Sequence, residues 1–217
     1  MRDFPGVILV ATIWAYWFGV GVMIVRVRRE TRTLAGLIPE RRHERLMWLL
    51  WVPLVVAWLV LPHLALTHAQ GRGSARLFDP GDPAYAALRW IAALCAMASL
   101  LATSTCWARM GGHWRMDVGA RKDELITDGP FRYVRHPIYA LSRLLMACTF
   151  IVMPTWAMLA LAAVHFYLTQ QRAGHEEEHL SNVHGAAYRD YATRTGRFLP
   201  RLRAFGASRR SQVGEES

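Results

Sequence analysis

The feature that most constrains this chain is the gathering of its apolar residues into long uninterrupted blocks. Residues 4–25 carry no charged side chain over 22 positions, which is enough for one helix to cross a bilayer. Further blocks cover residues 46–66 and 85–107, the latter interrupted only by Arg89, whose long side chain can extend to the membrane surface. With 53% hydrophobic and 19% charged residues gathered in this way, the chain cannot be disordered, a coiled coil or an ordinary soluble enzyme.

A fourth apolar stretch, residues 138–168, is broken at Met153-Pro154-Thr155. Two helices of about 15 residues joined by this proline turn predict a helical hairpin. Arg143 lies one to two turns into the first helix, where it either lines a polar cavity or extends to the membrane surface. The sequence therefore predicts an all-α polytopic membrane protein with about five transmembrane helices, the last two forming a hairpin.

The basic residues predict how the spans are oriented. Seven of the 26 lie in residues 26–45, six in residues 108–137 and eight after residue 168, against two in residues 67–84 and one before the first span. Because basic loops are retained on the cytoplasmic side, we expect the N-terminus outside and the C-terminus inside. The 25 arginines cluster beside apolar blocks, which argues against nucleic acid as a partner and favours a bacterial inner membrane protein.

Two polar segments flank the predicted hairpin. The first is residues 125–139, LITDGPFRYVRHPIY, and the second is residues 172–180, RAGHEEEHL. A compact hairpin returns its ends to one side, so His136 and Glu176 should be neighbours on the cytoplasmic face. Amides at a turn and a helix start, together with carboxylates and aromatic rings, suit a zwitterionic cofactor that carries a nucleoside.

The string GPFRYVRHPIY, followed by R-x-x-x-E-E-x-x-L, G-x-x-Y-x-x-Y and then Phe198-Leu199-Pro200, resembles the isoprenylcysteine carboxyl methyltransferase family. These are integral membrane enzymes that use S-adenosylmethionine. The resemblance is close over residues 125–200, and it extends to the earlier spans only by hydropathy. It implies methyl transfer to a lipophilic acceptor that presents a carboxylate, thiol or amine at the membrane surface.

Carried over by position, the resemblance also implies site residues. Arg172 would orient an acceptor carboxylate, while Glu177 and His136 are the candidates to take a proton from a thiol or amine. The backbone of residues 123–126 would approach the adenosyl group. The residues that would bind the cofactor are Leu125, Ile126, Phe131, His136, Pro137, Ile138, Tyr139 and Glu176. The chain departs from the family pattern at Leu141, Met153 and His184, which bears on the pocket's shape and the acceptor.

We expect three parts: the spans of residues 1–107, a cofactor-binding catalytic region over residues 108–200, and a basic flexible tail over residues 201–217. Two other functions stay open. One is an NADPH-dependent membrane reductase of the sterol-reductase type, in which Arg132 and Arg135 hold the 2′-phosphate. The other is a non-catalytic membrane protein that keeps the fold.

No metal site is predicted. His175 and His179 lie one helical turn apart and would share a helix face, but no third ligand follows at a recognisable spacing. From the apolar spans and the resemblance, the expected partners are the membrane and a lipophilic small-molecule or lipid substrate.

Overall fold

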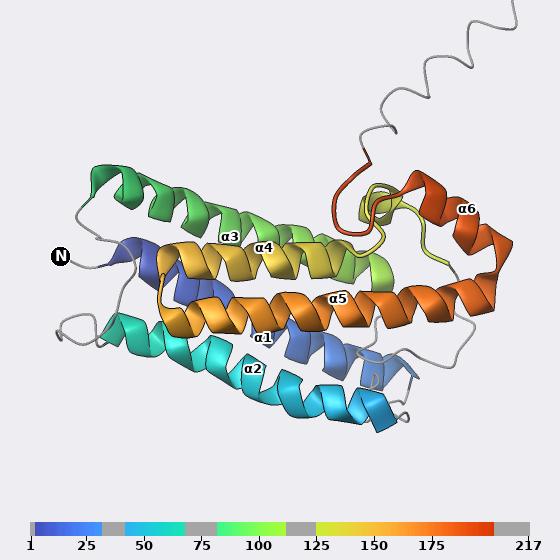
Figure 1. Ribbon diagram of the computed structural model, residues 1–217, viewed down its shortest axis with the longest axis horizontal. Helices are drawn as coiled ribbons and strands as arrows, with labels where there is room; N and C mark the ends of the chain where they lie inside the picture. The colour runs from blue at the N-terminus through green and yellow to red at the C-terminus, as the bar shows by residue number, and fades with distance from the viewer. Residues whose placement is uncertain (1–2, 32–41, 68–81, 112–124, 202–217) are drawn as a thin grey trace, which may run out of the picture.

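The computed structural model describes residues 3–31, 42–67, 82–111 and 125–201, and all the regular elements in these ranges are helices. Five helices run side by side, and a short sixth helix lies at one end of them (Figure 1). Their bounds are α1 Phe4–Thr31, α2 Arg42–Thr67, α3 Pro83–Met110, α4 Pro137–Val152, α5 Trp156–His184 and α6 Ala186–Arg194, with a 3₁₀ turn, η3, at Gly129–Arg132. The predicted all-α class is confirmed.

Three of these helices are long and apolar enough to cross a membrane: α1, α2 from Leu49 onward, and α3. Helix α4 is apolar but shorter, with 16 residues. Large apolar side chains point outward from the bundle, as expected where lipid is the solvent. They include Phe18, Leu49 and Leu101, which are 75%, 71% and 68% exposed.

The predicted hairpin is present, and its turn lies at the proline break. Met153 ends α4 by donating its N–H to the Thr149 carbonyl at 3.0 Å, and the Thr155 hydroxyl caps α5 by accepting from the Met158 N–H at 3.2 Å. Helix α5 is longer than predicted. It has 29 residues and continues past residue 168 to His184. Arg172, Glu176 and Glu177 therefore lie on a helix continuous with the apolar segment.

The end of the bundle that holds the α4–α5 turn is fastened by Arg89. We predicted that this side chain extends to the membrane surface; it is instead 8% exposed and bonded to protein groups. Its guanidinium donates to Asp3 Oδ2 at 2.5 Å and to the Val152 carbonyl at 3.2 Å. One arginine therefore joins α3 to the start of α1 and to the end of α4.

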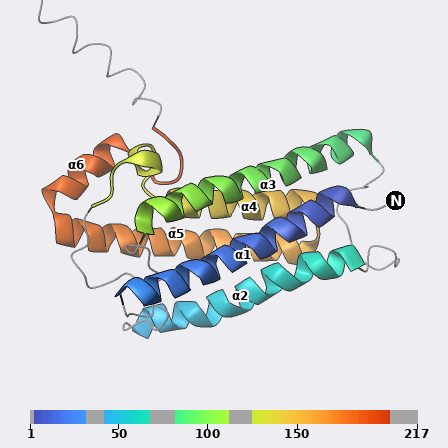
Figure 2. The same ribbon diagram turned by 180° about the vertical axis from the view of Figure 1, so that it is seen from behind.

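The core contains side chains of α1, α2, α3, α4 and α5. Ala92, Ala93 and Ala96 are buried on α3, and side chains this small let α3 and α4 approach closely. The fully buried Trp58 donates its Nε1–H to Thr149 Oγ1 at 3.2 Å. Seen from behind, α1 starts at the Arg89 end and finishes at the end where α6 and η3 gather (Figure 2). The two polar segments of the sequence therefore meet at that second end.

Candidate active site

Residues that follow α6 lie alongside the segment that leads into α4. The Arg135 N–H donates to the Gly196 carbonyl at 2.8 Å, and the His136 N–H donates to the Arg197 carbonyl at 3.1 Å. A side chain at Gly196 does not fit, because its Cβ would lie 1.7 Å from the Leu199 carbonyl oxygen. Glycine thus permits a tight bend that holds residues 195–201 against the start of α4.

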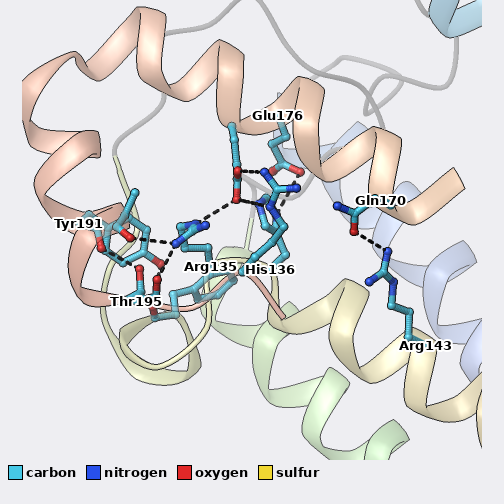
Figure 3. A network of polar contacts seen from close by, with 11 residues as sticks. Arg135, His136, Arg143, Gln170, Glu176, Tyr191 and Thr195 are labelled. Atoms are coloured by element: carbon cyan, nitrogen blue, oxygen red, sulfur yellow. Dashed lines mark hydrogen bonds and ion pairs between the residues drawn. The ribbon is translucent and has the colours of Figure 1, made fainter. Parts of the chain in front are cut away.

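Figure 3 shows the polar network around Arg135 and His136. Its centre is Glu177. Its Oε1 accepts hydrogen bonds from Arg135 Nε at 2.9 Å, Arg197 Nε at 3.0 Å and His136 Nε2 at 3.2 Å, and its Oε2 contacts the Arg197 guanidinium. Burial by itself would raise the pKa of Glu177, but the hydrogen bonds from His136, Arg197 and Arg135 outweigh it and hold this pKa far below its ordinary range. Glu177 is therefore a carboxylate at neutral pH.

Arg135 anchors the same network to the backbone. Its Nη1 donates to the Ala192 carbonyl at 3.0 Å and to the Thr195 carbonyl. Since its Nε donates to Glu177, the guanidinium is held by both a side chain and the backbone. Nearby, the Tyr191 hydroxyl donates to the Phe131 carbonyl at 2.6 Å and so ties α6 to η3. Burial raises the pKa of Tyr191 to about 12, so this hydroxyl keeps its proton.

His136 is 5% exposed and lies between the two glutamates. Its Nε2 donates to the Glu177 carboxylate, so when the ring is neutral Nδ1 keeps a lone pair. That Nδ1 lies 3.7 Å from Glu176 Oε2. The His136 ring stacks on Tyr139, with centroids 5.5 Å apart and planes inclined by 17°. The Tyr139 hydroxyl accepts from Arg172 Nε at 2.9 Å, which links the start of α4 to α5.

A small open cleft lies beside this network. It is lined by Met110, Phe131, Arg135, His136, Pro137, Ile138, Tyr139 and Glu176. Its volume is about 60 Å³, well below the roughly 300–1,000 Å³ of a typical ligand site, so it holds only part of a nucleoside cofactor. Glu176 keeps 36% of its side chain exposed here, against 14% for Glu177.

Six of the eight residues predicted to bind the cofactor line this cleft: Phe131, His136, Pro137, Ile138, Tyr139 and Glu176. Leu125 and Ile126 are half-buried and are not among the lining residues; the preceding residues 123 and 124 lie outside the described part of the chain. Met110 lines the cleft without having been predicted. Its place at the end of α3 is the only signal that could have suggested it.

Arg143 neither lines this cleft nor extends freely to the membrane surface. It donates to Thr169 Oγ1 at 2.7 Å and to the Phe166 carbonyl at 2.9 Å, and its guanidinium lies 3.7 Å from the Phe198 ring centre. It therefore fastens α4 to α5 and to the residues after α6. The three residues that depart from the family pattern do not line the cleft; they are Leu141, Met153 and His184.

Among the residues that the structure describes, no group of three or more His, Cys, Asp or Glu side chains is arranged to hold a metal ion. His175 and His179 both lie on α5, as the helical spacing predicts.

Residues 88–187 match a family model described as phospholipid methyltransferase. Over this part, which is slightly less than half of the chain, the sequence is similar to phospholipid methyltransferases. The matched part runs from α3 through the hairpin into the first residues of α6, and it includes His136, Arg172, Glu176 and Glu177. The resemblance to the isoprenylcysteine carboxyl methyltransferases is thereby confirmed, and the match supports a membrane methyltransferase.

The chain is also 30% identical over 118 residues to a nickel-cobalt-cadmium resistance protein, NccN, of Alcaligenes xylosoxydans xylosoxydans. The aligned region covers 54% of each protein, so the chain spans about half the length of this curated relative.

Proposed function

We propose that the protein is an S-adenosylmethionine-dependent methyltransferase that acts on a lipophilic acceptor at the cytoplasmic face of the membrane. The observation that carries this proposal is the unequal pairing of two adjacent carboxylates. Glu177 is saturated by two arginines and a histidine, whereas Glu176 faces an open cleft beside His136. A carboxylate left accessible in this way suits a ligand that carries an ammonium, a sulphonium or ribose hydroxyls.

The residues present fit this cofactor by their chemistry. Glu176 would bind its cationic or hydroxyl groups, while Phe131, Pro137, Ile138 and Tyr139 provide apolar and aromatic lining. Leu125 and Ile126 precede η3 and would offer backbone groups to the adenosine. S-adenosylmethionine, when bound, supplies an activated methyl group. The protein would then contribute mainly by orienting the acceptor and excluding water from the site.

Arg172 would orient the acceptor. Its Nε donates to Tyr139, which lies at the cleft, so a carboxylate held by Arg172 would lie next to the cofactor. An ionised carboxylate needs no general base. A thiol or amine does, and the lone pair on His136 Nδ1 suits that role better than Glu177, whose strongly lowered pKa makes it a weak base. We therefore assign Glu177 to holding His136 and Arg135 in place.

The charges at the two ends support the predicted orientation. Arg28 and Arg29 finish α1 at the end that carries the site arginines, whereas the start of α1 lies at the Arg89 end (Figure 2). We propose five spans with the N-terminus outside and the C-terminus and the site inside, in a bacterial inner membrane. Residues 1–107 would supply three spans, residues 108–200 the catalytic region, and residues 201–217 a basic tail.

The test is calorimetric binding to the detergent-purified full-length protein, with S-adenosylmethionine, S-adenosylhomocysteine and NADPH measured side by side. We expect saturable binding of the first two. Glu176→Ala should weaken it at least about tenfold, the loss typical of a charge-assisted contact. Glu178→Ala is the matched control, because Glu178 is exposed on the same helix. Failure of all three ligands to bind a folded sample would support the non-catalytic alternative.

Binding of NADPH alone would overturn the proposal in favour of a reductase. The structure gives a reason to expect otherwise. Arg135, one of the two arginines suggested for a 2′-phosphate, is already bonded to Glu177 and to two backbone carbonyls.

A further inference from the structure

Beyond the cleft, α4 and α5 face each other through polar side chains. The contact between Tyr139 and Arg172 is followed by Arg143 Nε on Thr169 Oγ1 at 2.7 Å. The next is Ser142 Oγ against His165 Nε2 at 3.2 Å. On α5 these partners are residues 165, 169 and 172, a spacing that puts them on one helix face. A polar seam therefore leads from the candidate active site into the apolar part of the bundle.

The seam ends at His165, the contact farthest from the candidate active site, and this residue is 0% exposed. Its Nε2 is partnered by Ser142, but its Nδ1 has no hydrogen-bond partner among the described residues. The rings of Trp58 and Trp51 lie against it, with centroids 5.0 and 5.7 Å from that of the imidazole. The buried Nε1 of Trp51 also lacks an acceptor within the described ranges. Buried polar atoms without partners are costly, and an ionisable side chain inside a membrane segment usually marks a functional site.

These two atoms belong to none of the steps proposed above. Trp51 can only donate a hydrogen bond, so whatever completes it must be an acceptor such as an oxygen atom. Trp51 is half-buried on α2, which packs mainly on α1 and α5. The cluster therefore reaches the outer surface of the bundle at Trp51, where a lipophilic molecule can arrive from the bilayer.

We propose that His165 and Trp51 form an intramembrane subsite for an oxygen of the methyl acceptor. This deepens the proposed function and depends on it. Arg172 and His165 are seven residues apart on one face of α5, or roughly 10 Å at 1.5 Å per residue. The acceptor is thus a long molecule with its methylated end at Arg172 and a carbonyl or hydroxyl oxygen roughly 10 Å further into the membrane.

The test uses the full-length protein in detergent. Octadecanoic acid, octadecanethiol and octadecylamine first establish which end group is methylated. A series of keto derivatives of that compound then moves one carbonyl along the chain. Binding is followed by quenching of tryptophan fluorescence, which needs no turnover, and methylation by kcat/KM. We expect a maximum where the carbonyl lies roughly 10 Å from the end group, at about tenfold above the plain chain.

His165→Phe should abolish this preference while leaving S-adenosylmethionine affinity within about twofold. His63→Phe is the matched control, because His63 is exposed on α2. If His165→Phe does not fold, two other variants replace it. Trp51→Phe should lower the preference for one carbonyl position, and His165→Gln should keep part of that preference.

The outcomes separate the two proposals. Methylation with no dependence on carbonyl position in the unmodified protein overturns the subsite alone. A position-dependent fluorescence signal that His165→Phe removes, in a protein that neither binds S-adenosylmethionine nor methylates any acceptor, overturns the methyltransferase and keeps the subsite as a lipid site.

Discussion

The two ends of the helical bundle each hold a buried arginine against a carboxylate, yet the two pairs leave different surroundings. At the end that holds the α4–α5 turn, Arg89 pairs with Asp3 and with the carbonyl of Val152, and the contact closes the bundle. At the opposite end, Arg135 and Arg197 converge on Glu177, and the preceding residue, Glu176, lines a cleft. The same type of ion pair therefore joins helices at one end and frames the candidate site at the other.

This difference teaches that adjacent carboxylates on one helix can have opposite roles. Glu176 and Glu177 are separated by about 100° around α5. Glu177 pairs with Arg135, Arg197 and His136 and is neutralised. Glu176 lies 3.7 Å from the other ring nitrogen of His136 and lines the cleft. The arginines that hold Glu177 are thus occupied and cannot neutralise Glu176.

The largest effect is expected for Glu177→Gln, which leaves Arg135, with 11% of its side chain exposed, and the half-buried Arg197 without their anion. Breaking a fully buried pair typically costs about 3–5 kcal/mol in the free energy of unfolding, and we expect a loss near the lower end of this range. Chemical denaturation in detergent, followed by tryptophan fluorescence, measures it. Glu178→Gln is the control and should change stability by less than about 0.5 kcal/mol.

The same variant makes a prediction for pH. Because the pKa of Glu177 is lowered on folding, its stabilising contribution is complete above the ordinary glutamate pKa of about 4.3 and is lost as pH falls below it toward the folded value. The difference in Tm between the natural protein and Glu177→Gln should therefore be constant at neutral pH and shrink below about pH 4. A difference that stays unchanged in acid would show that Glu177 is not the anion described above.

Gly196→Ala tests how the backbone after α6 holds the candidate site. A Cβ at 1.7 Å from the Leu199 carbonyl oxygen forces the residues after α6 away from Arg135 and His136. We expect a loss of about 2–3 kcal/mol, together with faster proteolysis after residue 194. Gly174→Ala is a strong control, because it lies within α5 with open space around it and should stabilise the protein by about 0.5–1 kcal/mol.

Arg89→Met tests whether the contacts at the α4–α5 turn serve stability alone. The variant loses its hydrogen bonds to Asp3 and to the Val152 carbonyl, and we expect a loss of about 1–3 kcal/mol in stability. Cofactor affinity measured by calorimetry should stay the same; a change would link the two ends. Arg26→Met, which removes an exposed pair with Glu30, should cost less than about 0.5 kcal/mol.

Tyr139→Phe should have the smallest effect and the most specific one. It removes the hydroxyl that accepts from Arg172, a bond worth about 1 kcal/mol, and that also interacts with Glu176. If Tyr139 positions Arg172, KM for the acceptor should rise about fivefold, and cofactor affinity should fall by a smaller factor. Tyr133→Phe, at an exposed tyrosine, should change neither quantity. Equal losses in acceptor and cofactor binding would contradict the assignment of Arg172 to the acceptor.

The sequence was enough to predict the apolar helices and the turn between α4 and α5, because long apolar runs and Pro154 depend only on neighbouring residues. It did not predict the polar continuation of α5 or the short helix α6. It did predict that His136 and Glu176 are neighbours, since a hairpin brings its own ends together. The structure places their side chains 3.7 Å apart.

The contacts that frame the site were not predictable in the same way. Arg197 reaches Glu177 and Gly196 meets Arg135 only because the chain after α5 turns back at Gly185 and again at Gly196. Neither contact has a periodic signature, and arginines are so frequent in this chain that their partners cannot be assigned by charge alone. Arg89 shows the same limit, because its partner Asp3 is 86 positions away.

The position of residues 195–201 in the chain has a consequence for biosynthesis. These residues follow every helix in the described part of the chain, so the ribosome delivers them after the bundle has begun to enter the membrane. Until they arrive, Glu177 lacks Arg197, and the backbone of Arg135 and His136 lacks its partners. A nascent chain can therefore insert and pack before the candidate site is assembled, and a stop codon just after α6 would yield a membrane-inserted protein with an unassembled site.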